Sequence, residues 1–239
     1  MAFEQEKPAP ASTARQTKFL LVALMVLTFN TGLIDAVSYI GLGRVFVANM
    51  TGNVVLLAFA AAGVSGLSVT RALSSLGGFL IGATIGGKLG TSLAAGSRRR
   101  LILSAGILEA LLIFAAAVSA IGFEMRSSAP AHQLYTMIVL TALSMGLRNA
   151  TVRQLGVADV TTTVLTLTLT GLAADSPVAG GSNPRPVRRI FSIIALFMGA
   201  LSGAYLLRYG IALPLFVTGA CVLFTTAAYV VIAATVVKE

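Results

Sequence analysis

Long apolar stretches separated by short polar loops run through almost the whole chain. They fall at about 19–41, 50–64, 72–95, 101–123, 133–152, 160–174, 190–207 and 211–236. Six of them come close to the roughly 20 residues that a helix needs to cross a membrane. The second and sixth hold only about 15 residues, or roughly 22 Å of helix, against a hydrocarbon core about 30 Å thick. This pattern predicts an all-α, polytopic membrane helix bundle of six full spans and two short segments.

The two halves of the chain repeat each other. Gly32-Leu33-Ile34-Asp35-Ala36 recurs as Gly146-Leu147-Arg148-Asn149-Ala150, Asn49-Met50-Thr51 as Asp159-Val160-Thr161, and Gly82-Ala83-x-x-Gly86 as Gly199-Ala200-x-x-Gly203. We therefore divide the chain into a disordered cytoplasmic tail (1–18), a first membrane repeat (19–123) and a second membrane repeat (132–236). Internal repeats in membrane proteins often form pseudo-symmetric bundles with a binding site where the halves meet, as in many transporters.

The positions of the 17 Lys and Arg residues distinguish between topologies. If all eight stretches cross, nine of these residues lie on one side and eight on the other. If the two short stretches enter and leave on the same side, thirteen lie on one side and four, Arg44, Arg71, Arg126 and Arg208, on the other. Positive residues concentrate on the cytoplasmic side. We therefore predict cytoplasmic termini and an inverted 3+3 repeat with short re-entrant or broken segments, although residues 44–66 could also form one continuous helix.

Composition supports the membrane class. Hydrophobic residues make up 56% of the chain and charged residues 10%, which is too few to cover a water-facing surface. The net charge of +9 would suggest nucleic acid in a soluble chain, but most basic residues stand in short loops, where membrane orientation explains them better. The single Cys221 excludes a disulfide framework or a cysteine-based metal site. We expect membrane lipid around the chain, no nucleic-acid partner and no cofactor or metal, and a homo-oligomer is compatible with this interpretation.

Polar residues gather at the start of the first short segment. Asn49 and Thr51 could cap the helix that begins there. Alternatively, the free N–H groups and positive dipole end of this short helix could face a solute near the midplane of the membrane. Asn49, Thr51 and Asn53 are therefore candidate solute-binding residues.

The matching segment of the second half is rich in threonine. At 100° per residue, several of these threonines fall within a face about 100° wide, with Thr161 and Thr168 nearly opposite. That face could line a path for a solute, or its hydroxyls could bond back to the preceding helical turn. The candidate solute-binding residues of this half are Asp159, Thr162, Thr163, Thr166 and Thr170.

Few ionisable residues lie at membrane depth, and each is a functional candidate. Asp35, near the outer end of the first span, could bind a cation or a proton. Glu109, near the middle of the third, could carry a proton or form a neutral hydrogen bond to a neighbouring helix. Arg148 could be a counter-charge, but we interpret it as an anchor at the inner face of the membrane. Asp35 and Glu109 are the candidate proton-coupling residues.

Two further patterns limit the function. The Gly82/Gly86 and Gly199/Gly203 pairs are typical of close helix packing. No Ser/His/Asp or Cys/His set falls at membrane depth and the sequence has no P-loop, so we do not expect an enzyme.

Four strings resemble the YoaK family of bacterial membrane proteins, also called domain of unknown function 1275. They are Gly-Leu-Ile-Asp-Ala-Val-Ser-Tyr at 32–39, Val-Phe-Val-Ala-Asn-Met-Thr-Gly-Asn at 45–53, Met-Gly-Leu-Arg-Asn-Ala-Thr-Val-Arg at 145–153 and Thr-Thr-Thr-Val-Leu-Thr at 161–166. The resemblance implies a multi-pass protein of the bacterial cytoplasmic membrane and carries no activity with it. From the residues we expect a secondary transporter or channel for a small polar solute, with proton coupling through Asp35 or Glu109. The alternative is a non-transporting membrane scaffold or partner-binding subunit.

Overall fold

A computed structural model describes residues 11–94, 98–123, 131–156 and 165–236. Within these ranges every regular element is a helix, so the all-α prediction is confirmed. The α-helices are α1 (Ala11–Ala36), α2 (Met50–Ala61), α3 (Val69–Ala94), α4 (Arg98–Ser119), α5 (Ala131–Leu155), α6 (Leu165–Ala174), α7 (Pro186–Leu206) and α8 (Ala212–Val236). A π-helical turn, η1 (Val37–Gly41), continues α1, and two 3₁₀ turns, η2 (Pro177–Ala179) and η3 (Leu207–Tyr209), precede and follow α7. Helix α1 begins at Ala11, so helical structure extends into the predicted tail.

Five helices are long and apolar enough to cross a membrane, at Phe19–Gly41, Val69–Leu93, Arg98–Ser119, Pro186–Tyr209 and Ala212–Ile232. Helix α5 has 25 residues but a more polar composition, and its polar residues Thr141, Ser144, Arg148 and Thr151 are buried. Helices α2 and α6 have 12 and 10 residues, less than a membrane crossing requires. The two predicted short segments are therefore present as short helices in a multi-pass membrane bundle.

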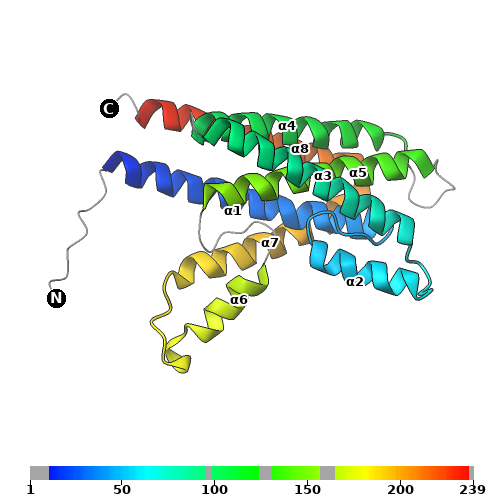
Figure 1. Cartoon of the computed structure of the whole chain (residues 1–239), viewed down its shortest axis with the longest axis horizontal. Coiled ribbons are helices and arrows are strands. Elements are labelled where there is room, and N and C mark those ends of the chain that lie inside the picture. Colours follow the sequence, from blue (N-terminus) through cyan, green and yellow to red (C-terminus); the bar gives the residue numbers. More distant parts are fainter. Residues whose placement is uncertain (1–10, 95–97, 124–130, 157–164, 237–239) are drawn as a thin grey trace.

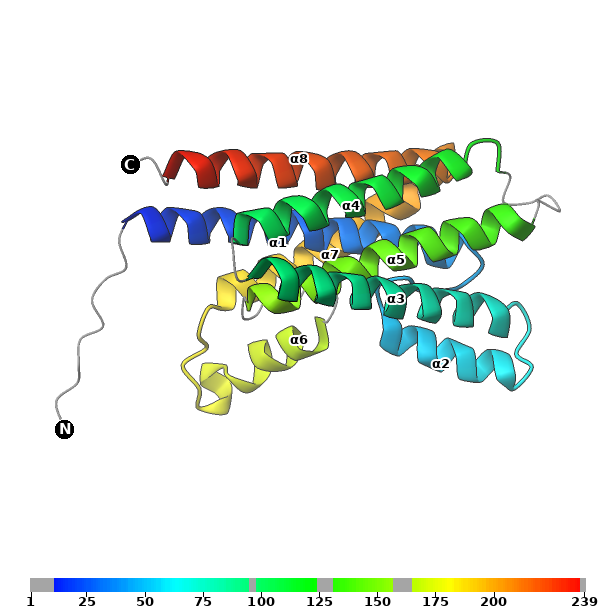
Figure 2. The ribbon, with the colours of Figure 1, turned by 45° about the horizontal axis from the view of Figure 1, so that its top comes forward.

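The six long helices alternate in direction along the bundle (Figures 1 and 2). Helices α1, α4 and α7 run one way, and α3, α5 and α8 run the other. The start of α1 and the end of α8 lie at the same end of the bundle, which we call the termini end; the opposite end is the far end. The two short helices start near the middle of the bundle and diverge, α2 toward the far end and α6 toward the termini end (Figure 1).

Glycines allow close contacts between the two halves. Helix α1 packs along α7, and α5 packs along α3. A Cβ added to Gly32 would overlap the carbonyl oxygen of Leu196, and one added to Gly146 would overlap that of Phe79. The predicted packing role of the other glycine pairs is confirmed, because a Cβ would also overlap the backbone of the facing helix at Gly82, Gly86, Gly199 and Gly203. Each of these helix pairs joins one helix of the first half to one of the second.

The remaining long helices enclose the core. Helix α4 packs on α8, α4 also packs on α5, and α8 packs on α1. A large apolar cluster that includes Ile34, Val37, Ile113 and Leu215 fills the middle and far end of this four-helix core. A smaller cluster of Leu20, Leu24, Val152, Leu155 and Tyr229 lies at the termini end.

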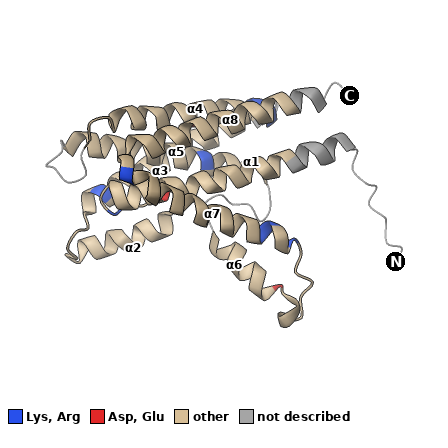
Figure 3. Ribbon diagram, turned by 180° about the vertical axis from the view of Figure 1, so that it is seen from behind, with Lys and Arg blue, Asp and Glu red and all other residues tan. Residues whose placement is uncertain are grey.

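Charged side chains are sparse along the bundle (Figure 3). Among the described residues, three charged side chains are buried: Glu109, Arg148 and Arg189. A charge at membrane depth is costly unless it is paired, so these three residues need a physical explanation.

Candidate functional site

A cleft of about 1100 Å³ lies between the halves of the chain. Its walls come from α1, α3, α5 and α7, and the starts of the short helices α2 and α6 reach it. Four predicted site residues meet there: Asp35, Asn49, Thr51 and Thr166. Asn149, which the repeat matches with Asp35, lines the same cleft. The cleft therefore collects matched polar positions from both halves.

Asp35 stands beside the start of α2. Its carboxylate Oδ1 accepts a hydrogen bond of 3.0 Å from the backbone N–H of Ala48. Asn49 caps α2, as one interpretation of the sequence expected, because its Oδ1 accepts a bond of 3.1 Å from the N–H of Gly52. A carboxylate is favourable at this positive end of a helix. The π-helical turn η1 begins two residues after Asp35, and such turns occur frequently at functional sites.

Asn53 lies outside the cleft. Its Oδ1 accepts a bond of 3.3 Å from the N–H of Phe46, and its amide nitrogen donates to the carbonyl of Ala72 at 3.1 Å. The hydroxyl of Ser75 donates to the carbonyl of Phe46 at 2.6 Å. Asn53 is buried and holds the loop before α2 against α3. Its hydrogen bonds serve the local structure.

The threonine segment is described only from Leu165 onward, so Asp159, Thr162 and Thr163 lie outside the described residues. Thr166 lines the cleft, but Thr170, one turn farther along α6, is exposed and does not. Thr168 is the buried threonine of this helix. The described part of α6 therefore brings one hydroxyl of the predicted face to the cleft.

Arg189 attaches α6 to α7. Its Nη1 donates to the carbonyl of Gly171 at 2.7 Å and lies 2.8 Å from the carboxylate of Asp175. The burial of this arginine is explained by the two contacts, which fix the end of α6 on α7.

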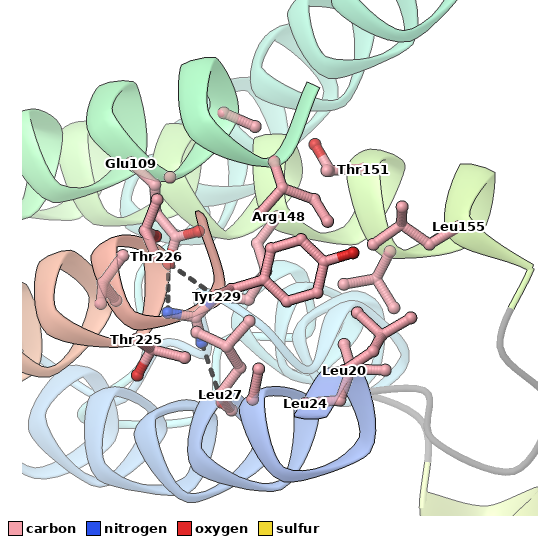
Figure 4. Close-up of a pocket in the computed structure, with 16 residues that line it drawn as sticks. Leu20, Leu24, Leu27, Glu109, Arg148, Thr151, Leu155, Thr225, Thr226 and Tyr229 are labelled. Carbon is pink, nitrogen blue, oxygen red and sulfur yellow. Dashed lines mark hydrogen bonds and ion pairs between the residues drawn. The ribbon is translucent and has the colours of Figure 1, made fainter. Parts of the chain in front are cut away.

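A second, much smaller cavity of about 50 Å³ lies in the termini half of the bundle, between α1, α4, α5 and α8 (Figure 4). Leu20, Leu155 and Tyr229 line its outer part and are 5%, 8% and 9% exposed, so the cavity approaches the protein surface there. Glu109 and Arg148 lie at its inner end. We call it the narrow cavity.

Glu109 and Arg148 form a buried ion pair (Figure 4). Nε of Arg148 donates to Oε1 of Glu109 at 2.7 Å, and Nη2 donates to the same oxygen. Nη1 donates to the carbonyl of Leu27 at 3.0 Å and to the hydroxyl of Thr31 at 3.1 Å. Arg148 thereby joins α5 to both α4 and α1. Several good hydrogen bonds are what a buried charge pair needs to offset its desolvation.

The interpretation of Arg148 as an anchor at the membrane face is therefore wrong. Its side chain is 1% exposed and lies inside the bundle, because α4 and α1 supply an acceptor on each side. Sequence reasoning missed the pair, since 39 residues separate its members. One signal was available. Aligned through Gly106 and Gly219, the repeat matches Glu109 with Val222, and it matches Arg148 with Ile34, so both charges stand where the other half is apolar.

The fold and these two sites describe an all-helical, multi-pass membrane protein with polar groups enclosed between its halves. The model of a protein family of unknown function, DUF1275, matches residues 23–229, and the chain belongs to that family. It is similar to the UPF0700 transmembrane protein YoaK of Bacillus subtilis (strain 168), with 35% identity over 165 residues, 68% of this chain and 69% of the relative. No solved structure matches the chain. The predicted family is confirmed, and the matched range contains Asp35, Glu109 and Arg148.

Proposed function

We propose that the protein is a secondary transporter or channel for a small polar solute, and that the cleft is the path of this solute. The observation that carries the proposal is the origin of the cleft residues: Asp35 and Asn149 come from matched positions, and the short helices of the two halves, α2 and α6, both reach the cleft. Solute sites of transporters with internal repeats typically lie at the repeat interface, where interrupted helices end.

The proposed architecture is an inverted 3+3 repeat with six spans, α5 being the sixth. Helix α5 has the required length of 25 residues. Its Thr141, Ser144 and Arg148 are at most 1% exposed, so its polar side chains face protein instead of lipid. The pairing of α1 with α7 corresponds to that of α5 with α3, through matched Gly32 and Gly146. Opposite directions of the matched helices also support the inverted arrangement (Figure 2).

The membrane and its orientation are part of the proposal. We infer a bacterial cytoplasmic membrane with both chain termini on the cytoplasmic side. The start of α1 and the end of α8 lie at the same end of the bundle, which supports termini on one side of the membrane (Figure 2). Lys and Arg are more frequent in the terminal segments and the loops of the termini end than in the loops of the far end, which supports a cytoplasmic termini end. No chemistry on the solute is proposed, so the protein is not an enzyme in this interpretation.

The chemistry of the cleft indicates what kind of solute would fit. Asp35 supplies a carboxylate, Asn49 and Asn149 supply amides, and Thr51 and Thr166 supply hydroxyls. The start of α2 adds backbone N–H groups and the positive end of a helix dipole. Donors and acceptors together suit a neutral polar or zwitterionic solute better than a simple ion.

One observation favours the alternative of a non-transporting scaffold. Asn49 and Asn53, the amides of the most distinctive family string, both bond to backbone groups, in α2, in the loop before it and in α3. In a scaffold, these polar side chains would serve packing alone.

Uptake of a panel of small polar solutes into proteoliposomes, with and without a pH gradient, tests the proposal. Thr166→Val should reduce uptake because it removes a hydroxyl from the cleft, and Asp35→Asn should reduce it by removing the carboxylate. Thr170→Val is the matched control, since this exposed threonine lies outside the cleft. Absence of uptake for every solute would favour the scaffold.

Single cysteines in a Cys221→Ala background test the topology. Arg71→Cys and Arg98→Cys stand at opposite ends of the bundle, at the starts of α3 and α4. Impermeant reagents should label them from opposite sides of the membrane, and labelling of both from one side would contradict six spans.

A further inference from the structure

The same two helices, α1 and α5, line both the narrow cavity and the cleft. On α5, Arg148 reaches the narrow cavity, whereas the next residue, Asn149, lines the cleft. On α1, Thr31 bonds to Arg148, whereas Asp35, one turn farther, lines the cleft. A change in the contacts of Arg148 therefore acts on two helices that also line the cleft.

The narrow cavity has room for a few water molecules. Its volume is about 50 Å³, and about 10–15 Å³ of such space is enough to hold one water molecule. Thr151, Thr226 and Tyr229 bring hydroxyl groups to walls that are otherwise largely apolar. Such a cavity can conduct a proton through water and hydroxyls, and it is far smaller than the cleft of about 1100 Å³.

Access to the ion pair is one-sided in the described structure. Beyond Glu109 and Arg148, the core toward the far end is closed by Ile34, Val37 and Ile113, each 0% exposed. The termini end is therefore the side from which a proton would reach Glu109.

We propose that Glu109 is a proton-binding site reached through the narrow cavity, and that its ion pair with Arg148 is a latch that the proton opens. This inference rests on the proposed transport function and assigns its coupling group. A proton from cavity water forms one O–H bond with the carboxylate of Glu109, which becomes a neutral acid. Arg148 keeps its own proton, so the net charge of the pair rises from zero to +1.

Opening of the latch follows from the bonds that remain. Protonation removes the charge attraction that holds α4 to α5 at this point. Arg148 stays bonded to the carbonyl of Leu27 and the hydroxyl of Thr31, so its side chain can move together with α1. Loss of the proton to cavity water restores the pair. The moving parts are thus α4 on one side and the cleft helices α1 and α5 on the other.

Among the residues that line the narrow cavity, Glu109 is the one that we expect to exchange a proton. Helix α5 presents Arg148, and α8 presents Tyr229 together with neutral Val222, Thr225 and Thr226. Helix α1 presents only a carbonyl, a hydroxyl and apolar side chains, α3 contributes no residue to the cavity, and Arg98 of α4 bonds to the carbonyl of Leu155 near the outer end. Arginine and tyrosine side chains do not ordinarily titrate near neutral pH.

Infrared difference spectroscopy of the purified protein in lipid tests the proton site directly, without any solute. A carbonyl stretch of a protonated carboxyl group should grow as pH falls, and Glu109→Gln should abolish it. Asp35→Asn is the control that should retain this band. If the pH dependence of this band is unchanged in Glu109→Gln, Glu109 is not the proton-binding group and the proposal is overturned.

Cysteine labelling in a Cys221→Ala background tests the latch. Thr51→Cys, in the cleft, should change its labelling rate with pH, and Glu109→Gln should hold it at the acidic value at every pH. Equal pH dependence with and without Glu109→Gln would contradict the proposal.

A second variant guards against a folding failure of Glu109→Gln. Glu109→Val with Arg148→Ile gives both positions the residues that the other half has, Val222 and Ile34. It should lose both the infrared band and the pH dependence at Thr51→Cys, and retention of either would overturn the latch. These readouts also distinguish failure of the two proposals. If the infrared band and the labelling at Thr51→Cys behave as expected but no solute is taken up, only the transport proposal fails. If solute is taken up but the band and the labelling do not behave as expected, only the proton-site proposal fails.

Discussion

The two ends of the core formed by α1, α4, α5 and α8 differ, although the sequence repeat matches them position by position. At the termini end the narrow cavity is lined by Leu24, Thr151, Thr226 and Tyr229. Their matched residues toward the far end are Ile138, Val37, Ile113 and Ala116, and all four are 0% exposed. The same helical plan therefore encloses a cavity at one end and a packed core at the other.

The difference comes from a few side chains. Two hydroxyl residues at the termini end, Thr151 and Thr226, are matched by the aliphatic Val37 and Ile113. The ion pair of Glu109 and Arg148 separates the two regions. Under the proposed transport function, such an asymmetric pair of ends is expected of a state with access from one side, because alternating access moves one repeat against the other around a fixed site.

The largest expected change in stability comes from removing one partner of the ion pair between Glu109 and Arg148. Glu109→Val leaves the guanidinium of Arg148 buried without its partner and should destabilise the protein by about 3–5 kcal/mol. The double variant Glu109→Val with Arg148→Ile has the residue types of the matched Val222 and Ile34 at both positions. Its stability should equal that of the wild type or exceed it by about 1–4 kcal/mol. Unfolding in mixed detergent micelles measures both variants. A double variant as unstable as the single one would contradict this account.

Shortening one side chain at each end of the core tests whether the two ends are packed differently. Ile113→Ala removes side-chain volume from the packed end and should cost about 2–5 kcal/mol. Thr226→Ala, at the matched position beside the narrow cavity, should cost less than about 1 kcal/mol, since space already exists there. The difference in the free energy of unfolding between the two variants is the quantity to measure. Equal losses would mean that the ends are packed alike.

Asn30 offers a smaller effect of opposite sign. Its amide is buried and has no hydrogen-bond partner among the described residues, whereas the hydroxyl of the matched Ser144 donates to the carbonyl of Thr141 at 2.8 Å. Asn30→Leu replaces an unsatisfied amide with an apolar group of similar size and should stabilise the protein by about 1–3 kcal/mol. A lower melting temperature in a thermal unfolding assay would indicate that the amide has a partner, such as a water molecule.

A small effect on stability is also expected from Thr151→Val, which places the matched residue type of Val37 in the narrow cavity. The hydroxyl of Thr151 bonds back to the carbonyl of Leu147 at 2.9 Å, so its loss should cost less than about 1.5 kcal/mol. The less polar wall should slow protonation of Glu109, measured as a weaker pH response of labelling at Thr51→Cys. An unchanged response would show that this hydroxyl does not contribute to the proton path.

Much of the fold and part of the cleft were predictable from the sequence. The apolar stretches indicated a helical membrane bundle, and their lengths distinguished α2 and α6 from the long helices. The repeat located the glycines that make the close helix contacts. These features depend on local composition and on spacing along one segment, which are written directly in the order of residues.

Other features depended on how the helices pack. The burial of polar α5, the role of Asn53 as a clamp on α3 and the pairing of Glu109 with Arg148 involve residues from different helices. Apolar periodicity in a membrane helix does not tell which side faces lipid and which faces protein, because both environments accept apolar side chains. The sequence alone thus determined the helices, their repeat and their close contacts. The tertiary structure alone decided that Arg148 turns inward to Glu109, since only there do α4 and α1 supply acceptors for its buried charge.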